Sequence, residues 1–366
     1  MHIAEYQALW YAGRTLVLRM QPKAHRKNPM KLSNPVTLYI LTLVAVVFAM
    51  PTARADEIVW GINASAPSVT AHIDAIDITT GALATTGCGT LSVCDFAAPN
   101  AAAAALDGRG IAINGATNTI YYGGAGSNNI YKATTGGLDG GIAFAAVDAA
   151  GIPLSGIQTI TFDGTYLWVT DNSTVGNIYR YNLTGGKPTL TVKGLGLGGP
   201  LGLNGFQDGV EYIGNNEFVA NRGDGSAPYD LYTLSPSSST LASLTLTTPQ
   251  FLKLPTVTTG TFTGVTFDGT HYFVANPVGY NGGTTGGIME FDSTGAFIKE
   301  ITLTGGLQPL VGGGTGWNLE DLASIGNTSS LPPTTNPVPE PGAVMLLGTA
   351  VLGLSWLFRR RSIPNK

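Results

Sequence analysis

The chain has 366 residues, a formal net charge of −4 and only 11% charged residues. Its 19 Lys and Arg residues form no basic cluster between residues 56 and 330, which argues against a nucleic-acid surface, so no nucleic-acid partner is expected. Residues 56–330 are long enough to bury a sizeable core, as one large domain or two small ones.

The N-terminal region has the pattern of a secretory signal peptide. Lys31 is basic, residues 38–49 are apolar, and Ala53-Arg54-Ala55 is an A-x-A cleavage site directly before Asp56. We therefore predict export by the secretion machinery, cleavage by signal peptidase, and a mature chain that begins at Asp56. An uncleaved N-terminal anchor is the alternative.

Cys88 and Cys94 are the two cysteines of the chain. In an oxidising compartment they are predicted to close a small surface loop as a disulfide. A metal site made of these thiols is not expected, because two thiols without a nearby histidine fall short of the four ligands of a structural zinc site.

The mature chain contains a repeated strand pattern. Residues 156–170 and 262–276 are nearly superimposable, and each predicts a strand, an Asp-Gly turn and a second strand. Weaker copies cover residues 109–122 and 208–220. Equivalent apolar anchors recur at spacings of 49, 50, 55 and 57 residues, at Ile111, Ile160, Val210, Val265 and Leu322.

Four strands repeated about every 50 residues are typical of propeller blades. We predict an all-β fold, a β-propeller of about five four-stranded blades, with six blades as the alternative count. The strand at 318–325 is predicted to join those at 57–62, 73–78 and 82–83 in a mixed last blade, which removes an exposed sheet edge. A pair of β-sandwiches is the structural alternative. The repeats loosely resemble NHL-like and quinoprotein-like propellers, in architecture alone.

The chemistry of the mature domain is sparsely indicated. No nucleophile elbow, phosphate loop or HExxH motif is present, so we predict no catalytic residue and no organic cofactor. His72 and His271 are expected to be ordinary strand residues.

Three acidic residues lie next to predicted inner-strand anchors: Glu211, Glu320 and Asp321. If these strands line the central channel, the three carboxylates are candidates for binding Ca²⁺ or another hard cation. The alternative is that they cap strand ends and accept hydrogen bonds from backbone amides.

Aromatic side chains offer a second kind of site. These side chains could form a platform that binds sugar rings, or they could pack in the core between blades. The residues are Tyr166, Trp168, Tyr272 and Trp317.

The C-terminal region has the pattern of a single membrane-spanning helix that ends in a basic stop. Residues 342–358 carry no charge and would form a helix of roughly 25 Å, near the short end of the membrane-spanning range. The basic stop Arg359-Arg360-Arg361 is expected in the cytoplasm, so that the preceding domain lies outside the inner membrane. A buried C-terminal helix of a soluble domain is the alternative.

Together these patterns predict five segments in chain order. They are residues 1–29, an extended n-region or upstream mis-start; 30–55, the signal peptide; 56–328, the propeller; 329–337, a Pro/Thr spacer; and 338–361, the C-terminal sorting region with its helix at 342–358.

The C-terminal tail resembles the PEP-CTERM sorting signal of Gram-negative bacteria. The resemblance rests on the motif Val338-Pro339-Glu340-Pro341, the Gly- and Leu-rich helix, and Arg359-Arg360-Arg361. It implies recognition by a membrane-embedded exosortase that removes the helix, followed by display on the cell surface or release into an exopolysaccharide-rich matrix. It implies no activity for the domain that is sorted.

Three functions are consistent with the sequence. The first is a non-enzymatic surface or matrix protein whose propeller binds a polysaccharide or another protein. The second is a propeller hydrolase of the lactonase or esterase kind, with Glu211, Glu320 and Asp321 around a metal. The third is a purely structural matrix component.

Overall fold

The computed structural model divides the chain into two units, residues 1–55 and 56–366. All described residues belong to the second unit: 57–63, 71–100, 107–171, 177–193, 209–221, 229–236, 240–255, 262–276, 287–304, 308–309, 315–316 and 319–325. The predicted signal peptide with its cleavage site, the Pro/Thr spacer, the sorting motif and the C-terminal helix lie outside these residues.

The described residues form β-strands and no helix. One sheet has the order β23-β1-β2-β3, with β4 also paired to β2. Its strands are β1 (Ile58–Asn63), β2 (His72–Asp77), β3 (Ala82–Leu83), β4 (Asp95–Ala97) and β23 (Leu319–Ser324). A second sheet has the order β5-β6-β7-β8, with β5 (Asp107–Asn114), β6 (Thr119–Ala125), β7 (Asn129–Thr134) and β8 (Asp139–Ala145).

Two further groups of four strands share one eight-stranded sheet, because their outer strands pair in parallel. The first group is β9 (Ile157–Phe162), β10 (Tyr166–Asp171), β11 (Ile178–Asn182) and β12 (Pro188–Lys193). The second is β13 (Val210–Gly214), β14 (Glu217–Asn221), β15 (Tyr229–Pro236) and β16 (Leu241–Leu252). The β12–β16 pairing was not predicted from the repeats.

The remaining strands form two sheets. One has the order β17-β18-β19-β20, with β17 (Val265–Phe267), β18 (His271–Asn276), β19 (Gly287–Asp292) and β20 (Phe297–Thr302). The other is the short pair β21 (Gln308–Pro309) and β22 (Thr315–Gly316).

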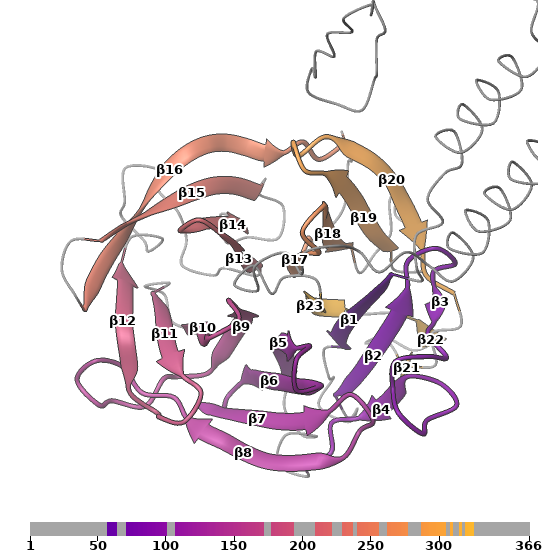
Figure 1. Ribbon diagram of the computed structural model, residues 1–366, viewed down its shortest axis with the longest axis horizontal. Coiled ribbons are helices and arrows are strands. Elements are labelled where there is room, and N and C mark those ends of the chain that lie inside the picture. Colours follow the sequence, from indigo (N-terminus) through magenta and orange to yellow (C-terminus); the bar gives the residue numbers. More distant parts are fainter. Residues whose placement is uncertain are drawn as a thin grey trace, which may run out of the picture. The chain divides into compact units, whose positions relative to one another are not determined.

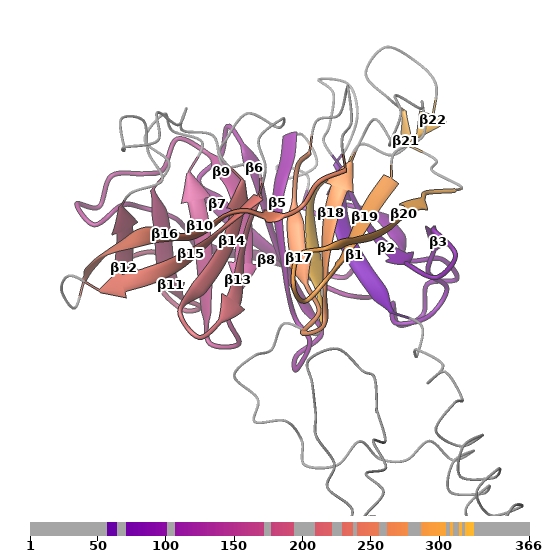
Figure 2. The same ribbon diagram turned by 90° about the horizontal axis from the view of Figure 1, so that it is seen from above.

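The strands β5, β9, β13, β17 and β23 lie toward a common centre (Figure 1), and Figure 2 shows the same sheets turned by 90°. β5 contacts β9 and β23, β13 contacts β9 and β17, and β17 contacts β23. These contacts form a closed cycle, β23-β5-β9-β13-β17, which is the arrangement of a β-propeller.

The ends of the domain meet in one sheet. β23 pairs antiparallel with β1, with Leu322 opposite Gly61 and Ser324 opposite Val59. β1 in turn pairs with β2. This is the closure predicted from the sequence, and it gives the inner edge of β1 a hydrogen-bonding partner.

The two most similar repeats have matching turns. The carboxylates of Asp163 and Asp268 accept hydrogen bonds from the backbone N–H groups two and three residues further on. The next residues, Gly164 and Gly269, have φ angles of 93° and 96°, which only glycine adopts without steric cost. Asp-Gly therefore specifies both hairpins through a side-chain hydrogen bond and a backbone conformation.

Apolar side chains from neighbouring groups pack against each other. Between the β9–β12 and β13–β16 groups, the ring of Trp168 stacks on that of Tyr212 at 5.6 Å and meets the edge of Phe218 at 5.0 Å. Strands in this region have apolar side chains on both faces, because a neighbouring sheet covers each face.

Three features of the strands were not predicted from the sequence. They are the pairing of β4 with β2, the strand β8 and the long strand β16.

Candidate functional site

The buried carboxylate of Asp321 links three of the inner strands. It lies on β23, and its Oδ2 accepts hydrogen bonds from the Ile111 N–H on β5 at 3.1 Å and from the Thr159 hydroxyl on β9 at 2.9 Å. The Ile160 N–H also donates to Oδ2 at 3.4 Å, and the Leu322 N–H to Oδ1 at 3.0 Å. Burial raises the pKa of Asp321 well above its usual value, an effect that these hydrogen bonds oppose.

Glu211 on β13 makes an equivalent link between β9 and β17. Its Oε2 accepts a hydrogen bond from the Thr161 hydroxyl on β9 at 2.5 Å. Its Oε1 accepts hydrogen bonds from the Thr266 hydroxyl and the Phe267 N–H on β17, both at 3.2 Å. Because β9 contacts both carboxylates, Glu211 and Asp321 together connect all five inner strands.

The inner strands approach one another closely around these groups. The backbone N–H of Gly264 donates to the Glu320 carbonyl oxygen at 2.8 Å. A Cβ added at Gly264 would overlap the Cα and Oδ1 of Asp321. Glycine at this position therefore leaves room for the buried carboxylate.

A small cavity lies between the described inner strands. A cavity of about 10 Å³ is lined by residues of all five inner strands, including Glu211, Thr161 and Thr266. That volume holds about one water molecule.

Glu320 differs from the two buried carboxylates. Its Oε2 lies 3.4 Å from the Arg109 guanidinium on β5, in a half-exposed ion pair. Among the described residues, Glu211, Glu320 and Asp321 are not brought together as a three-ligand group. The hydrogen bonds of Glu211 and Asp321 correspond to the alternative in which these acidic residues accept hydrogen bonds from backbone amides. Threonine hydroxyls, which the sequence did not indicate, also donate to both carboxylates.

The described residues contain one cluster with the spacing of a metal site, and the sequence did not indicate it. His72, Asp74 and Asp95 place one ligand atom each within 4.8 Å of the other two. His72 Nδ1 lies 2.6 Å from Asp95 Oδ1, and the Asn63 amide donates to Asp74 Oδ2. Burial and the nearby Asp95 raise the pKa of Asp74 well above its usual value, whereas the hydrogen bond from His72 lowers the pKa of Asp95.

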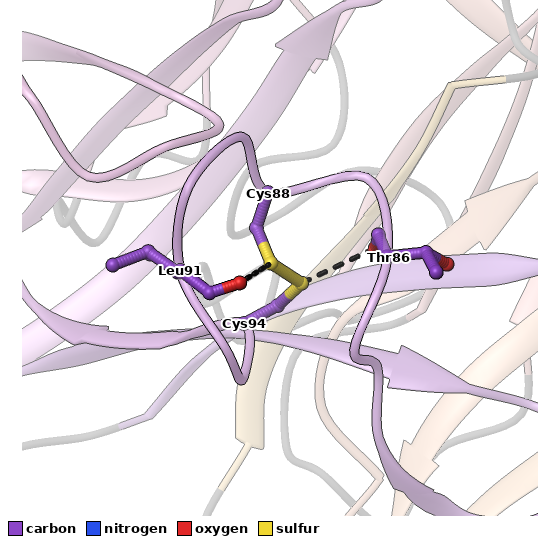
Figure 3. Close-up of a disulfide and its surroundings, with 4 residues drawn as sticks. All are labelled: Thr86, Cys88, Leu91 and Cys94. Atoms are coloured by element: carbon purple, nitrogen blue, oxygen red, sulfur yellow. Dashed lines mark hydrogen bonds between the residues drawn. A yellow bond between two sulfur atoms is a disulfide. The ribbon is translucent and has the colours of Figure 1, made fainter.

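Cys88 and Cys94 form the disulfide that the sequence predicts (Figure 3). Cys94 Sγ lies 3.2 Å from the Thr86 carbonyl oxygen, and Cys88 Sγ lies 3.8 Å from the Leu91 carbonyl oxygen. Both sulfur atoms are buried, and the disulfide closes the loop that leads into β4.

Two of the aromatic candidates belong to the core. Trp168 and Tyr272 are 2% and 3% exposed, so neither ring can serve as an open sugar platform. Tyr166 is half-buried, and the Arg180 guanidinium lies 4.6 Å from its ring centre. Trp317 lies outside the described residues.

Comparisons with known proteins identify the sorting tail. The PEP-CTERM protein-sorting motif matches residues 337–361, so the chain carries this exosortase-associated signal. No curated protein matches the chain. In the part of the chain that the structure describes, we find no helix with the length and hydrophobicity needed to cross a bilayer.

Solved structures with a similar arrangement are distant in sequence. A nidogen–laminin complex has 12% identity and a TM-score of 0.39, covering 73% of this chain and 97% of the other. A gluconolactonase from Xanthomonas campestris has 14% identity and a TM-score of 0.41, covering 68% and 78%. A protein of unknown function from Bacteroides caccae has 12% identity and a TM-score of 0.38, covering 74% and 99%. Likenesses at this level carry no argument about function.

Proposed function

We propose that this chain is an exported protein of the cell surface or the exopolysaccharide matrix, sorted by an exosortase, whose propeller binds a partner without catalysis. The observation that carries the sorting part is the PEP-CTERM motif at residues 337–361. We further propose that the four groups of four strands and the five-stranded sheet of β1 are five propeller blades, on the basis of the closed cycle of inner strands.

The centre of the propeller supports a binding role over hydrolysis. In the lactonase-like alternative, Glu211, Glu320 and Asp321 would have to hold a cation in a channel open to substrate. Instead, Glu211 and Asp321 accept hydrogen bonds from neighbouring strands, and the central cavity is about 10 Å³. These contacts favour a structural use of both carboxylates.

A protein partner is favoured over a glycan. Trp168 and Tyr272 are buried, whereas three large aliphatic side chains between residues 138 and 152 are exposed. Leu138, Ile142 and Ile152 are 71%, 52% and 62% exposed. Aliphatic side chains contribute to protein interfaces by apolar burial, whereas sugar rings are usually bound by exposed aromatic faces and hydrogen bonds.

Sorting is tested by replacing Pro339, Glu340 and Pro341 with alanine in the native host. We expect a precursor that retains its C-terminal segment and stays in the inner-membrane fraction, measured by fractionation and mass spectrometry of the C-terminus. Replacement of the spacer residues Thr334 and Thr335 is the matched control. Surface delivery of the triple variant with its tail removed would contradict the sorting proposal.

Binding is tested with the purified protein on isolated matrix polysaccharide and on matrix proteins. We expect retention on the protein fraction that falls in Leu138→Ser and Ile152→Ser but not in the control Ile298→Ser, which alters an exposed aliphatic residue on β20. Retention on polysaccharide that none of these variants changes would favour glycan binding. Absence of retention on both would favour the structural matrix role, and ester or lactone hydrolysis lost in Glu211→Gln would favour the hydrolase.

A further inference from the structure

The β1-β2-β4 region brings an imidazole and two carboxylates onto one face of a sheet. His72 and Asp74 are two positions apart on β2, so both side chains point to the same face. Asp95 on β4 lies directly opposite Asp74 in the strand register. The three side chains therefore converge by strand geometry.

This arrangement places two acidic groups together where water is scarce. Asp74 is 1% exposed, and the side chains of Asp95 and His72 are 15% and 26% exposed. Carboxylates directly opposite each other on paired strands repel when both are ionised. A hydrogen bond between the Asp74 and Asp95 side chains avoids this repulsion while Asp74 holds a proton, and a cation shared between the two carboxylates would take the place of that proton.

Other parts of the chain hold the cluster in place. The buried Asn63 amide at the end of β1 donates to Asp74 Oδ2, which fixes the orientation of this carboxylate. Cys94 precedes Asp95, and its carbonyl oxygen accepts a hydrogen bond from the Ala75 N–H at 2.8 Å. The Cys88–Cys94 disulfide therefore helps to fix Asp95 beside β2. Such outer contacts are typical of the residues around metal ligands.

We propose that His72, Asp74 and Asp95 bind one divalent metal ion, with Asn63 as a positioning residue. One imidazole nitrogen and two carboxylate oxygens suit Zn²⁺ or Mn²⁺ better than Ca²⁺, which prefers six to eight oxygen ligands. Zn²⁺ is expected to bind most tightly of the three, following the general order of metal affinities. Binding requires neutral His72 and two ionised carboxylates, so any proton held between them is released to solvent.

The distances are close to those of a metal site. Two ligand atoms on one tetrahedral Zn²⁺ are about 3.4 Å apart, since each lies about 2.1 Å from the ion. His72 Nδ1 and Asp95 Oδ1 are 2.6 Å apart, and the three ligand atoms all lie within 4.8 Å of one another. Entry of the ion therefore requires this nitrogen and oxygen to separate by about 0.8 Å, which rotation of two partly exposed side chains can supply.

The test is titration of the purified, chelator-treated full-length chain with ZnCl₂, MnCl₂ and CaCl₂ by isothermal calorimetry, with metal content measured by mass spectrometry. We expect one Zn²⁺ per chain and weaker binding of the other two ions. His72→Gln and Asp95→Asn should each weaken Zn²⁺ binding by at least about 100-fold, and Asn63→Ala by about 10- to 100-fold. Asp95→Asn changes a partly exposed side chain, so its fold is expected to persist, as circular dichroism checks.

His271→Gln is the matched control. His271 also lies beside acidic groups, with Nδ1 3.7 Å from Asp268 and Nε2 3.9 Å from Glu290, but it is not part of a three-ligand cluster. This variant should bind Zn²⁺ like the unaltered chain. The proposal is overturned if the unaltered chain binds none of the three ions, or if folded His72→Gln and Asp95→Asn retain its affinity and stoichiometry.

Discussion

Replacement of Asp321 by alanine tests whether the axial carboxylates hold the propeller together. The change removes the acceptor used by the Ile111 N–H, the Thr159 hydroxyl and the Ile160 N–H, which belong to two other strands. A buried donor left without an acceptor costs about 1–3 kcal/mol, so three donors predict a loss of at least about 3 kcal/mol. For a domain of this size that loss lowers Tm by about 6–12 °C.

Scanning calorimetry of the purified chain measures this shift, with Glu217→Ala at the half-buried start of β14 as the control. A double-mutant cycle with Thr159→Val isolates the hydroxyl–carboxylate contact, for which we expect a coupling of about 1–3 kcal/mol. A Tm of Asp321→Ala that is indistinguishable from that of the control would refute the reasoning. In that case the carboxylate would not stabilise the ring.

Two further predictions concern pH and the disulfide. Because burial raises the pKa of Asp321 in the folded chain, the part of the stability that comes from its bound proton is complete below about pH 4 and is lost as the pH rises through the raised pKa. Asp321→Asn should therefore flatten the fall in unfolding free energy as the pH rises above about 4 in urea titrations, and an unchanged pH profile would contradict this. The disulfide joins residues with a sequence separation of 6, so Cys88→Ser with Cys94→Ser should lower the unfolding free energy by about 2 kcal/mol. Equal stability of the oxidised chain and the double variant in urea titrations would rule out this contribution.

The hairpins and the closure of the ring could be predicted because their signals are local or repeated. Asp163-Gly164 and Asp268-Gly269 specify turns through a side chain and a φ angle within the same few residues. The similarity of residues 156–170 and 262–276 gives the period of the repeat. Once that period is known, each repeat is expected to have four strands. Because the C-terminal end of the domain supplies a single strand, its partners in the sheet are expected from the N-terminal end.

The roles of the polar residues could not be predicted in the same way. The acidic residues next to the inner-strand anchors indicated a carboxylate at the centre, but not whether it would face a cation or hydrogen-bond donors. That choice depends on Thr159, Thr161 and Thr266, which come from other strands. His72 and Asp74 show a two-residue spacing, but their partner Asp95 follows a disulfide loop and joins them only through the β2–β4 pairing.

The sequence by itself determined the strand repeat, the closing strand, the disulfide and the PEP-CTERM tail, because each is encoded by neighbouring residues or by regular spacing. The tertiary structure decided which side chains meet at the axis and on the face of β2. Contacts between strands far apart in the chain depend on register and on the packing of whole sheets. For this reason the tail could be recognised from about thirty residues. The contacts of Glu211, Asp321, His72 and Asp95 could be seen only in the assembled domain.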